Sequence, residues 1–301
     1  LPAVPRRVLV TQRQSAAGYP FLASARADLG IQGHYYGQPT DQLIGMVRDI
    51  GFGWTKQQVV WADVEISKGR YEWGLLDAIV ADLYAADIAI LLAVTKAPAW
   101  ATSTGDNGTP RYPQDFADFM RAITARYRGK VSAYQLWNEP NLPTYLTPQW
   151  TGRKPTGARH YKKMLDAASA GLRSVGKSNR LVTAGLAPYG DDPGGSRTRP
   201  LRFWREVLCL NRKLKSARNC GKKASFDILA HHAINTSGPP RRSALHPDDA
   251  SSGDLPQVAR TLRAAERAGT TSGGRHSLWI TELWWESDPP SSDGYPPLVQ
   301  A

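Results

Sequence analysis

The stretch SAYQLWNEP, residues 132–140, is an apolar run that ends abruptly in an amide, an acid and a proline. Its length and its aromatic and aliphatic side chains are typical of a buried strand. A tight turn alone would account for Asn138 and Pro140. The acid Glu139 has a second explanation, because parallel α/β folds place reactive side chains at the C-terminal ends of their strands.

Similar apolar runs lie on both sides of this stretch and alternate with helical patterns such as TDQLIGMVRDIGF (40–52), for which Thr40 is the expected N-cap. Runs that are apolar without alternation favour parallel pairing under a cover of helices. Their ends recur roughly every 41 residues. The predicted strands are LGIQGHYY (29–36), WTKQQVVW (54–61), AILLAVTKAPAW (89–100), SAYQLWNEP (132–140), RLVTAGLAP (180–188), FDILAHHAIN (226–235) and HSLWITELWW (276–285).

The alternation predicts an α/β fold, a (β/α)8 TIM barrel. A doubly wound sheet is disfavoured because no Gly-rich phosphate turn follows the first strand. Residues 1–28 show no clean period and are interpreted as an N-terminal lead-in segment, and 29–301 as the TIM-barrel catalytic domain. Residues 286–301 are too few for another helix and strand. We therefore expect the barrel to be C-terminally incomplete, without its last helix–strand unit.

The chain of 301 residues is basic, with a formal net charge of +12, and much of the excess lies between residues 197 and 242. A solvated surface is the simpler explanation, and an acidic polysaccharide is the alternative partner. Nucleic acid is not expected, because no zinc-finger, RNP or helix-turn-helix pattern accompanies the charge. No apolar run approaches the ~20 residues of a membrane helix. We expect a monomer without membrane contact.

Cys209 and Cys220 are the only cysteines. Two cysteines around one short loop suit a local disulfide bond in an oxidising compartment. Two unpaired thiols are the alternative. The disulfide interpretation predicts a secreted, extracellular protein.

Two acids follow apolar strands directly, Glu139 on the fourth strand and Glu282 on the seventh. Either acid alone has a plain explanation, as a helix N-terminal residue or a salt-bridged strand end. Together they face each other across a barrel mouth, an arrangement that suits glycoside hydrolysis, and a separation of about 5 Å would mean retention. Repulsion from Glu282 is expected to raise the pKa of Glu139 and keep it protonated.

Polar and aromatic side chains at the other strand ends are predicted to bind substrate. Asn138 is expected to hydrogen-bond a sugar 2-hydroxyl, and the aromatic rings to stack on sugar faces. The predicted substrate-binding residues are Asn138, His34, Tyr35, Trp61, Trp100, Trp137, His232, Trp284 and Trp285. Of the neighbours His231 and His232, at most one enters the pocket, because adjacent strand residues face opposite ways. No metal and no cofactor is expected.

QLWNEPN (135–141) together with LWITELWW (278–285) resembles clan A of the glycoside hydrolases, the retaining (β/α)8 enzymes, and the segment WADVEISKGRYEW (61–73) is similar to secreted, cellulase-like members near families 5 and 39. The resemblance implies a carbohydrate substrate, Glu139 as acid/base and Glu282 as nucleophile. It departs from the clan at strand two, where Lys56 or Gln58 stands in place of an Arg. After strand six His232 matches the clan pattern but its Tyr has no counterpart, and the Trp of strand eight is absent. The departures leave an alternative, a non-catalytic carbohydrate-binding barrel acting on an acidic glycan.

Overall fold

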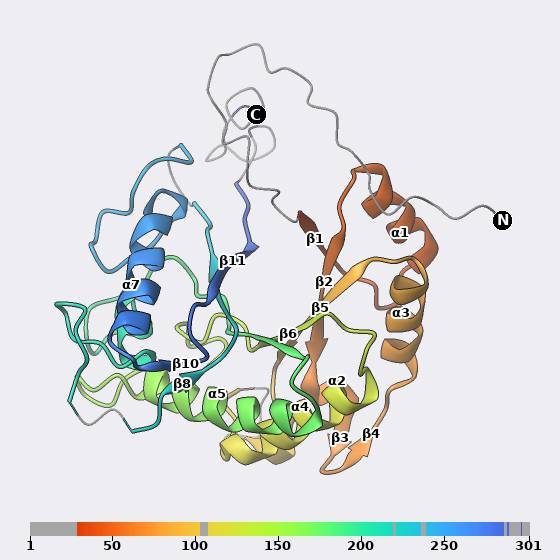
Figure 1. Cartoon of the computed structure of the whole chain (residues 1–301), viewed down its shortest axis with the longest axis horizontal. Helices are drawn as coiled ribbons and strands as arrows, with labels where there is room; N and C mark the ends of the chain where they lie inside the picture. Colours follow the sequence, from red (N-terminus) through yellow and green to blue (C-terminus); the bar gives the residue numbers. More distant parts are fainter. Residues whose placement is uncertain are drawn as a thin grey trace.

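The computed structural model describes residues 29–102, 108–218, 221–235, 239–285, 288 and 296. Seven parallel strands form one curled sheet in the order β1-β2-β5-β6-β7-β9-β11 (Figure 1). They are β1 (Gly30–Gly33), β2 (Trp54–Val60), β5 (Ala89–Thr95), β6 (Ala133–Leu136), β7 (Arg180–Val182), β9 (Ile228–His232) and β11 (Ser277–Glu282). Because sheet order follows chain order, the topology is that of a partial (β/α)8 barrel, as the sequence predicts.

Helices connect successive strands and lie on the outside of the sheet (Figure 1). They are α1 (Thr40–Asp49), α3 (Gly74–Ala85), α4 (Pro113–Arg126), α5 (Thr156–Val175), α6 (Pro200–Val207) and α7 (Leu255–Arg267), with the short α2 (Trp61–Val64), η1 (Ala99–Ala101) and η2 (Ser252–Asp254). Two small pairs of strands had no sequence prediction. These are the hairpin of β3 (Glu65–Ser67) and β4 (Arg70–Tyr71), and the parallel pair of β8 (Ala224–Ser225) and β10 (Thr271–Ser272).

Two apolar layers explain why the central strands are apolar on both faces. The larger layer lies between sheet and helices and includes Ile90, Leu92 and Val94 of β5. A smaller cluster fills the interior of the curled sheet and consists of Leu91, Ala133, Val182, Ile228 and Ala230, with Trp54 and Trp279 packed against it. Apolar side chains fill the interior near the starts of the strands. The polar side chains of the interior therefore lie at the C-terminal ends of the strands.

Trp54 at the start of β2 and Trp279 in β11 meet edge to face, with ring centroids 5.2 Å apart. Their strands are not hydrogen-bonded neighbours in the sheet. The contact therefore joins opposite walls of the curled sheet through side chains.

Several expectations concern residues outside the described part. The lead-in segment 1–28 lies there, and so does Cys220, so the disulfide bond and the secretion that it implies stay predictions. Cys209 follows the end of α6 with a φ of 57°. Among the described helices, none has the length and apolar character to cross a bilayer.

Candidate active site

Glu139 stands three residues beyond β6 in a turn with unusual backbone angles. Trp137 has a φ of 74° and Glu139 a φ of 35°, left-handed values that side chains other than glycine adopt at an energetic cost. The neighbouring strands hold the turn. The N–H of Trp137 donates to the carbonyl of Val94 (2.8 Å), and that of Glu139 to the carbonyl of Gly185 (3.0 Å). These hydrogen bonds direct the carboxylate of Glu139 toward the inside of the curled sheet.

Side-chain amides fasten the loop that follows. The amide of Asn141 donates to the carbonyl of Ala187 and accepts from its N–H, each at 3.0 Å. Gln149 donates to the carbonyl of Pro140 at 2.7 Å. Both amide side chains are buried. The backbone around Glu139 is therefore fixed from both sides, which pre-organises the acid.

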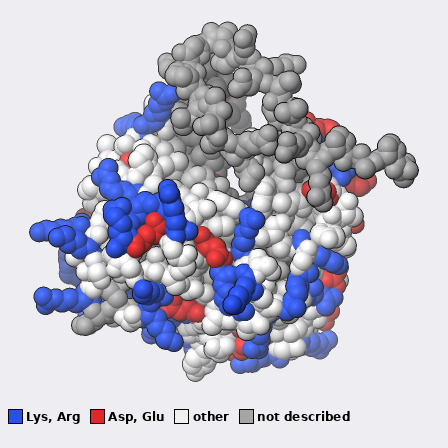
Figure 2. Space-filling model, viewed as in Figure 1, with Lys and Arg blue, Asp and Glu red and all other residues white. Residues whose placement is uncertain are grey.

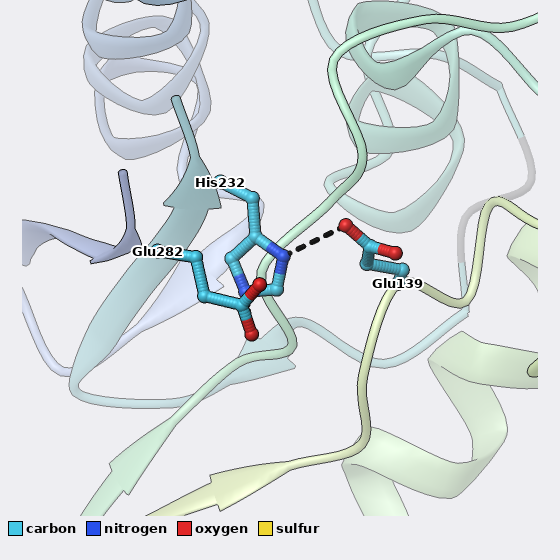
Figure 3. A group of neighbouring side chains, drawn as sticks. All are labelled: Glu139, His232 and Glu282. Carbon is cyan, nitrogen blue, oxygen red and sulfur yellow. Dashed lines mark hydrogen bonds and ion pairs between the residues drawn. The ribbon is translucent and has the colours of Figure 1, made fainter. Parts of the chain in front are cut away.

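His232, the last residue of β9, lies between the two predicted catalytic acids (Figure 3). Its Nδ1 is 3.0 Å from Oε1 of Glu139, and its Nε2 is 3.5 Å from Oε1 of Glu282. The ring is fully buried, and this burial lowers the pKa of His232 to about 3. At neutral pH the imidazole is uncharged, so only one ring nitrogen carries a proton.

Gly185, just beyond β7, gives this ring its space. A Cβ at position 185 would clash with Cδ2 and Nε2 of His232. The neighbouring His231 serves the structure, because its Nε2 lies 2.8 Å from the carbonyl oxygen of Ala250. Of the two histidines, only His232 therefore reaches the acids.

Burial raises the pKa of Glu139 to about 7, and the positive charge of Lys56 opposes the rise. The raised pKa agrees with the sequence-based expectation, but its physical cause differs. Desolvation of the carboxylate is responsible, whereas the expectation invoked repulsion from Glu282. With 12% of its side chain exposed and a pKa of about 7, Glu139 keeps a substantial protonated fraction at neutral pH.

Glu282 occupies a different environment, although it lies close by. Its Oε1 accepts a hydrogen bond from Nζ of Lys56 at 2.6 Å. Lys56 is in β2, and only 5% of it is exposed. Burial lowers the pKa of Lys56, and the charges of Glu282 and Glu139 oppose this effect. Lys56 and Glu282 thus form an ion pair inside the curled sheet. Lys56, and not Gln58, takes the position opposite the acid.

Tyr145 is a site residue that sequence reasoning missed. Burial raises the pKa of its hydroxyl, and the negative charges of Glu139 and Glu282 raise it further, while a hydrogen bond with Asn138 lowers it. The hydroxyl of Tyr145, in the loop after β6, thus lies beside Asn138 and within the electrostatic field of the two acids. Its backbone carbonyl accepts a hydrogen bond from Nε1 of Trp137 at 2.7 Å. In the sequence, only its position six residues after Glu139 could have indicated that Tyr145 belongs to the site.

Asn138 precedes the acid, is 3% exposed, and its Oδ1 has no hydrogen-bond partner among the described residues. A buried, unpaired amide oxygen beside the acids is available to a ligand donor. Oδ1 of Asn138 is therefore free to accept the predicted hydrogen bond from a sugar hydroxyl.

Three predicted substrate-binding aromatics lie in the core instead. Tyr35 is 1% exposed and its hydroxyl bonds Thr55 at 3.0 Å, while Trp61 and Trp137 are fully buried. The ring of Trp61 stacks on Phe119. These side chains have no free face for a sugar. The correction has a simple cause, because large apolar rings at strand ends pack under the covering helices.

The other predicted residues are more exposed. Trp100 is half-buried and donates its N–H to the carbonyl of Glu65 at 3.1 Å. His34 is exposed just after β1. Trp284, 45% exposed, stands two residues after Glu282. Trp285 is half-buried, and its buried Nε1 has no hydrogen-bond partner within the described part of the chain. Trp284 is the ring best exposed for stacking near the acids.

Glu139, His232 and Glu282 each offer one ligand atom, and these atoms lie within 4.8 Å of one another. Carboxylate and imidazole groups of this kind can bind a transition metal. The ammonium group of Lys56 opposes a further cation at Glu282. The two nitrogens of His232 also face different carboxylates. A metal-free site stays our prediction.

The family model of cellulases, glycosyl hydrolase family 5, matches residues 16–208. A solved family 39 glycoside hydrolase from Bacteroides cellulosilyticus WH2 is similar, with a TM-score of 0.60 and 18% identity over 86% of this chain and 49% of that chain. A broad-specificity endoglucanase from Clostridium longisporum gives 0.52 and 14% over 86% and 71%. A β-glycosidase gives 0.51 and 16% over 81% and 66%. The chain thus spans about half the length of the family 39 structure.

No curated protein sequence matches the chain significantly. A parallel sheet in barrel order, with one acid after its fourth strand and another at the end of its seventh, agrees with the glycoside hydrolase class that the family model gives. The chain belongs to the cellulase family, glycosyl hydrolase family 5. The resemblance noted in the sequence is thereby confirmed.

Proposed function

We propose that the protein is a retaining glycoside hydrolase that cleaves O-glycosidic bonds of a β-linked poly- or oligosaccharide by double displacement. One observation carries the proposal. Oxygen atoms of Glu139 and Glu282 lie within 4.8 Å of each other. Retaining enzymes hold their carboxyl groups about 5–5.5 Å apart, whereas inverting enzymes leave about 6.5–9.5 Å for a water molecule.

The different environments of the two acids support their separate roles. Glu139, with a pKa raised to about 7 by burial, keeps a proton to give to the departing oxygen. Glu282, paired with Lys56 at 2.6 Å, has the negative charge that attack requires. Neutral His232 stands between them and holds the spacing.

In the first step, the carboxylate of Glu282 attacks the anomeric carbon, and the bond to the leaving oxygen breaks as Glu139 protonates that oxygen. The product is a glycosyl ester of Glu282. In the second step, Glu139, now ionised, takes a proton from water, and the water oxygen attacks the anomeric carbon and releases Glu282. Two inversions give net retention.

The β-linkage and the glucan-like substrate rest on relatives. The family is named for cellulase, and the similar structures include an endoglucanase and a β-glycosidase. A monomeric, secreted enzyme without cofactor completes the proposal.

Chemical rescue tests the roles of the acids. With 2,4-dinitrophenyl β-cellobioside and sodium azide, Glu282→Ala is expected to form the α-glycosyl azide, of inverted configuration, because azide takes the place of the lost nucleophile. Glu139→Ala is the matched control and is expected to form the β-glycosyl azide, because Glu282 still forms the ester. Full activity of Glu282→Ala without azide would overturn the assignment. Binding of cellobiose by a wild-type protein without turnover would favour a carbohydrate-binding barrel.

A further inference from the structure

A second polar site lies on the outer wall of the barrel, away from the strand ends that carry the acids. It is a groove of about 890 Å³ between α5, α6 and the segment that follows α6. Its lining residues are Arg159, Lys162, Lys163, Asp166, Arg202, Arg205, Glu206, Cys209, Leu210, Asn211, Arg212, Ala217, Arg218, Gly221 and Lys222.

The groove is strongly basic. Eight of its lining residues are Lys or Arg and two are acidic, a net charge of +6 out of +12 for the whole chain. Figure 2 shows Lys and Arg side chains gathered at the left edge of the molecule, where Figure 1 places the segment after α6. Half of the chain's excess charge is thus concentrated in one hollow.

Internal ion pairs use only part of this charge. Within the groove, Lys162 pairs with Asp166 at 2.5 Å and Arg159 lies 3.8 Å from Glu206. Arg205 donates two hydrogen bonds of 2.7 Å to the carboxylate of Asp248.

Four exposed cations of the groove form no ion pair with an acid among the described residues. Within the described residues no carboxylate lies within 4 Å of the charged groups of Lys163, Arg212, Arg218 or Lys222. Four like charges held together repel one another, and an anionic ligand would relieve this repulsion.

The lining also indicates which polyanion fits. Among the described lining residues there is no aromatic side chain. Proteins that bind single-stranded nucleic acid stack its bases on aromatic rings, so the groove lacks that contact. Guanidinium groups pair with carboxylates in a forked geometry, as Arg205 already does with Asp248.

We propose that the groove between α5 and α6 binds an anionic polysaccharide whose sugars carry carboxylate groups, at a site separate from the catalytic acids. Binding there is independent of turnover at Glu139 and Glu282. It would hold the protein on acidic glycan through salt-sensitive contacts.

The test compares two triple variants of the full chain. Lys163→Glu/Arg212→Glu/Lys222→Glu changes exposed cations of the groove. Lys130→Glu/Lys177→Glu/Arg180→Glu makes the same charge change at exposed positions outside it. Circular dichroism and thermal unfolding establish that each variant is folded. Affinity is then measured by titration with polygalacturonate, dextran sulfate, neutral hydroxyethylcellulose and duplex DNA.

We expect the wild-type protein to bind polygalacturonate most tightly, with log affinity falling linearly as log salt rises. At low salt the groove variant is expected to lose at least about tenfold in affinity and to flatten the salt slope by about one for each removed contact, while the control variant loses less than about threefold. Equal losses in both variants would overturn the proposal, as would no affinity for polygalacturonate. Tighter binding of dextran sulfate or DNA would overturn the choice of ligand.

Discussion

Nζ of Lys56 lies 2.6 Å from Oε1 of Glu282, although the two residues are 226 positions apart in sequence. They belong to β2 and β11, strands that are not hydrogen-bonded to each other. The same two strands meet near their starts through Trp54 and Trp279. The apolar contact between Trp54 and Trp279 and the ion pair between Lys56 and Glu282 thus connect opposite walls of the curled sheet. The ion pair holds the proposed nucleophile.

Removal of Lys56 should change both rate and pH dependence. Its charge lowers the pKa of Glu139. Lys56→Met is therefore expected to move the alkaline limb of kcat/KM to higher pH and to lower kcat by about 10²-fold, because a preorganised charge at Glu282 is lost. pH–rate profiles give the measurement, with Lys177→Met as a surface control. A limb that stays in place, or moves to lower pH, would refute the coupling of Lys56 to Glu139.

In the proposed mechanism, the protonation of Glu139 should set the alkaline limit of activity. Because burial raises the pKa of Glu139 to about 7, the protonated acid disappears as pH rises through 7. We expect kcat/KM for an unactivated β-glucan oligosaccharide to fall tenfold per unit above that pH. A 2,4-dinitrophenyl glycoside needs no acid for its leaving group and should lose this limb. The same limb for both substrates would rule out Glu139 as the group observed.

The space at Gly185 is needed by His232. In Gly185→Ala the new methyl group would displace the imidazole from its place between the acids. We expect kcat to fall at least about tenfold, since small displacements of catalytic groups are costly. Gly45→Ala, whose methyl group meets nothing within 4 Å, is the matched control in α1. Unchanged activity of the position 185 variant would show that His232 does not set the spacing.

The hydroxyl of Tyr145 should matter without affecting the fold. Tyr145→Phe removes only the oxygen near Glu139, Glu282 and Asn138. The hydrogen bond lost is to the neutral amide of Asn138, and such bonds contribute about 0.5–1.5 kcal/mol, so we expect kcat/KM to fall about 2- to 10-fold with the melting temperature little changed. Tyr84→Phe, an exposed tyrosine on α3, serves as the control. Equal kinetics for both variants would remove Tyr145 from the site.

The sheet was predictable because its central strands are apolar on both faces, a pattern typical of parallel strands covered by helices. Boundaries were less accurate. Thr40 is the first helical residue of α1 and Pro39 takes the N-cap position, so the capping prediction was wrong. The strand predicted to extend to Trp100 ends at Thr95, and the chain then forms the 3-10 turn η1.

The closeness of Glu139 and Glu282 was predictable because each acid follows an apolar run in the sequence. Their supporting residues were harder to find. The contact of Lys56 depends on how the curled sheet brings β2 opposite β11, which no local pattern encodes. Gly185 and Tyr145 matter because of the side chains that the fold places next to them, His232 beside Gly185 and Asn138 beside Tyr145. The buried rings of Tyr35, Trp61 and Trp137 show the opposite error, because an aromatic residue at a strand end serves the core as well as it serves a sugar.

Covalent trapping tests the role of Glu282 most directly. The full chain is incubated with 2,4-dinitrophenyl 2-deoxy-2-fluoro-β-cellobioside, digested with pepsin and analysed by mass spectrometry, with Glu282→Gln as the control. A retaining mechanism predicts one fluorosugar per molecule, attached to Glu282, and no label on the variant. A label on another residue, or release of dinitrophenol without any labelled peptide, would contradict the assignment of Glu282 as nucleophile.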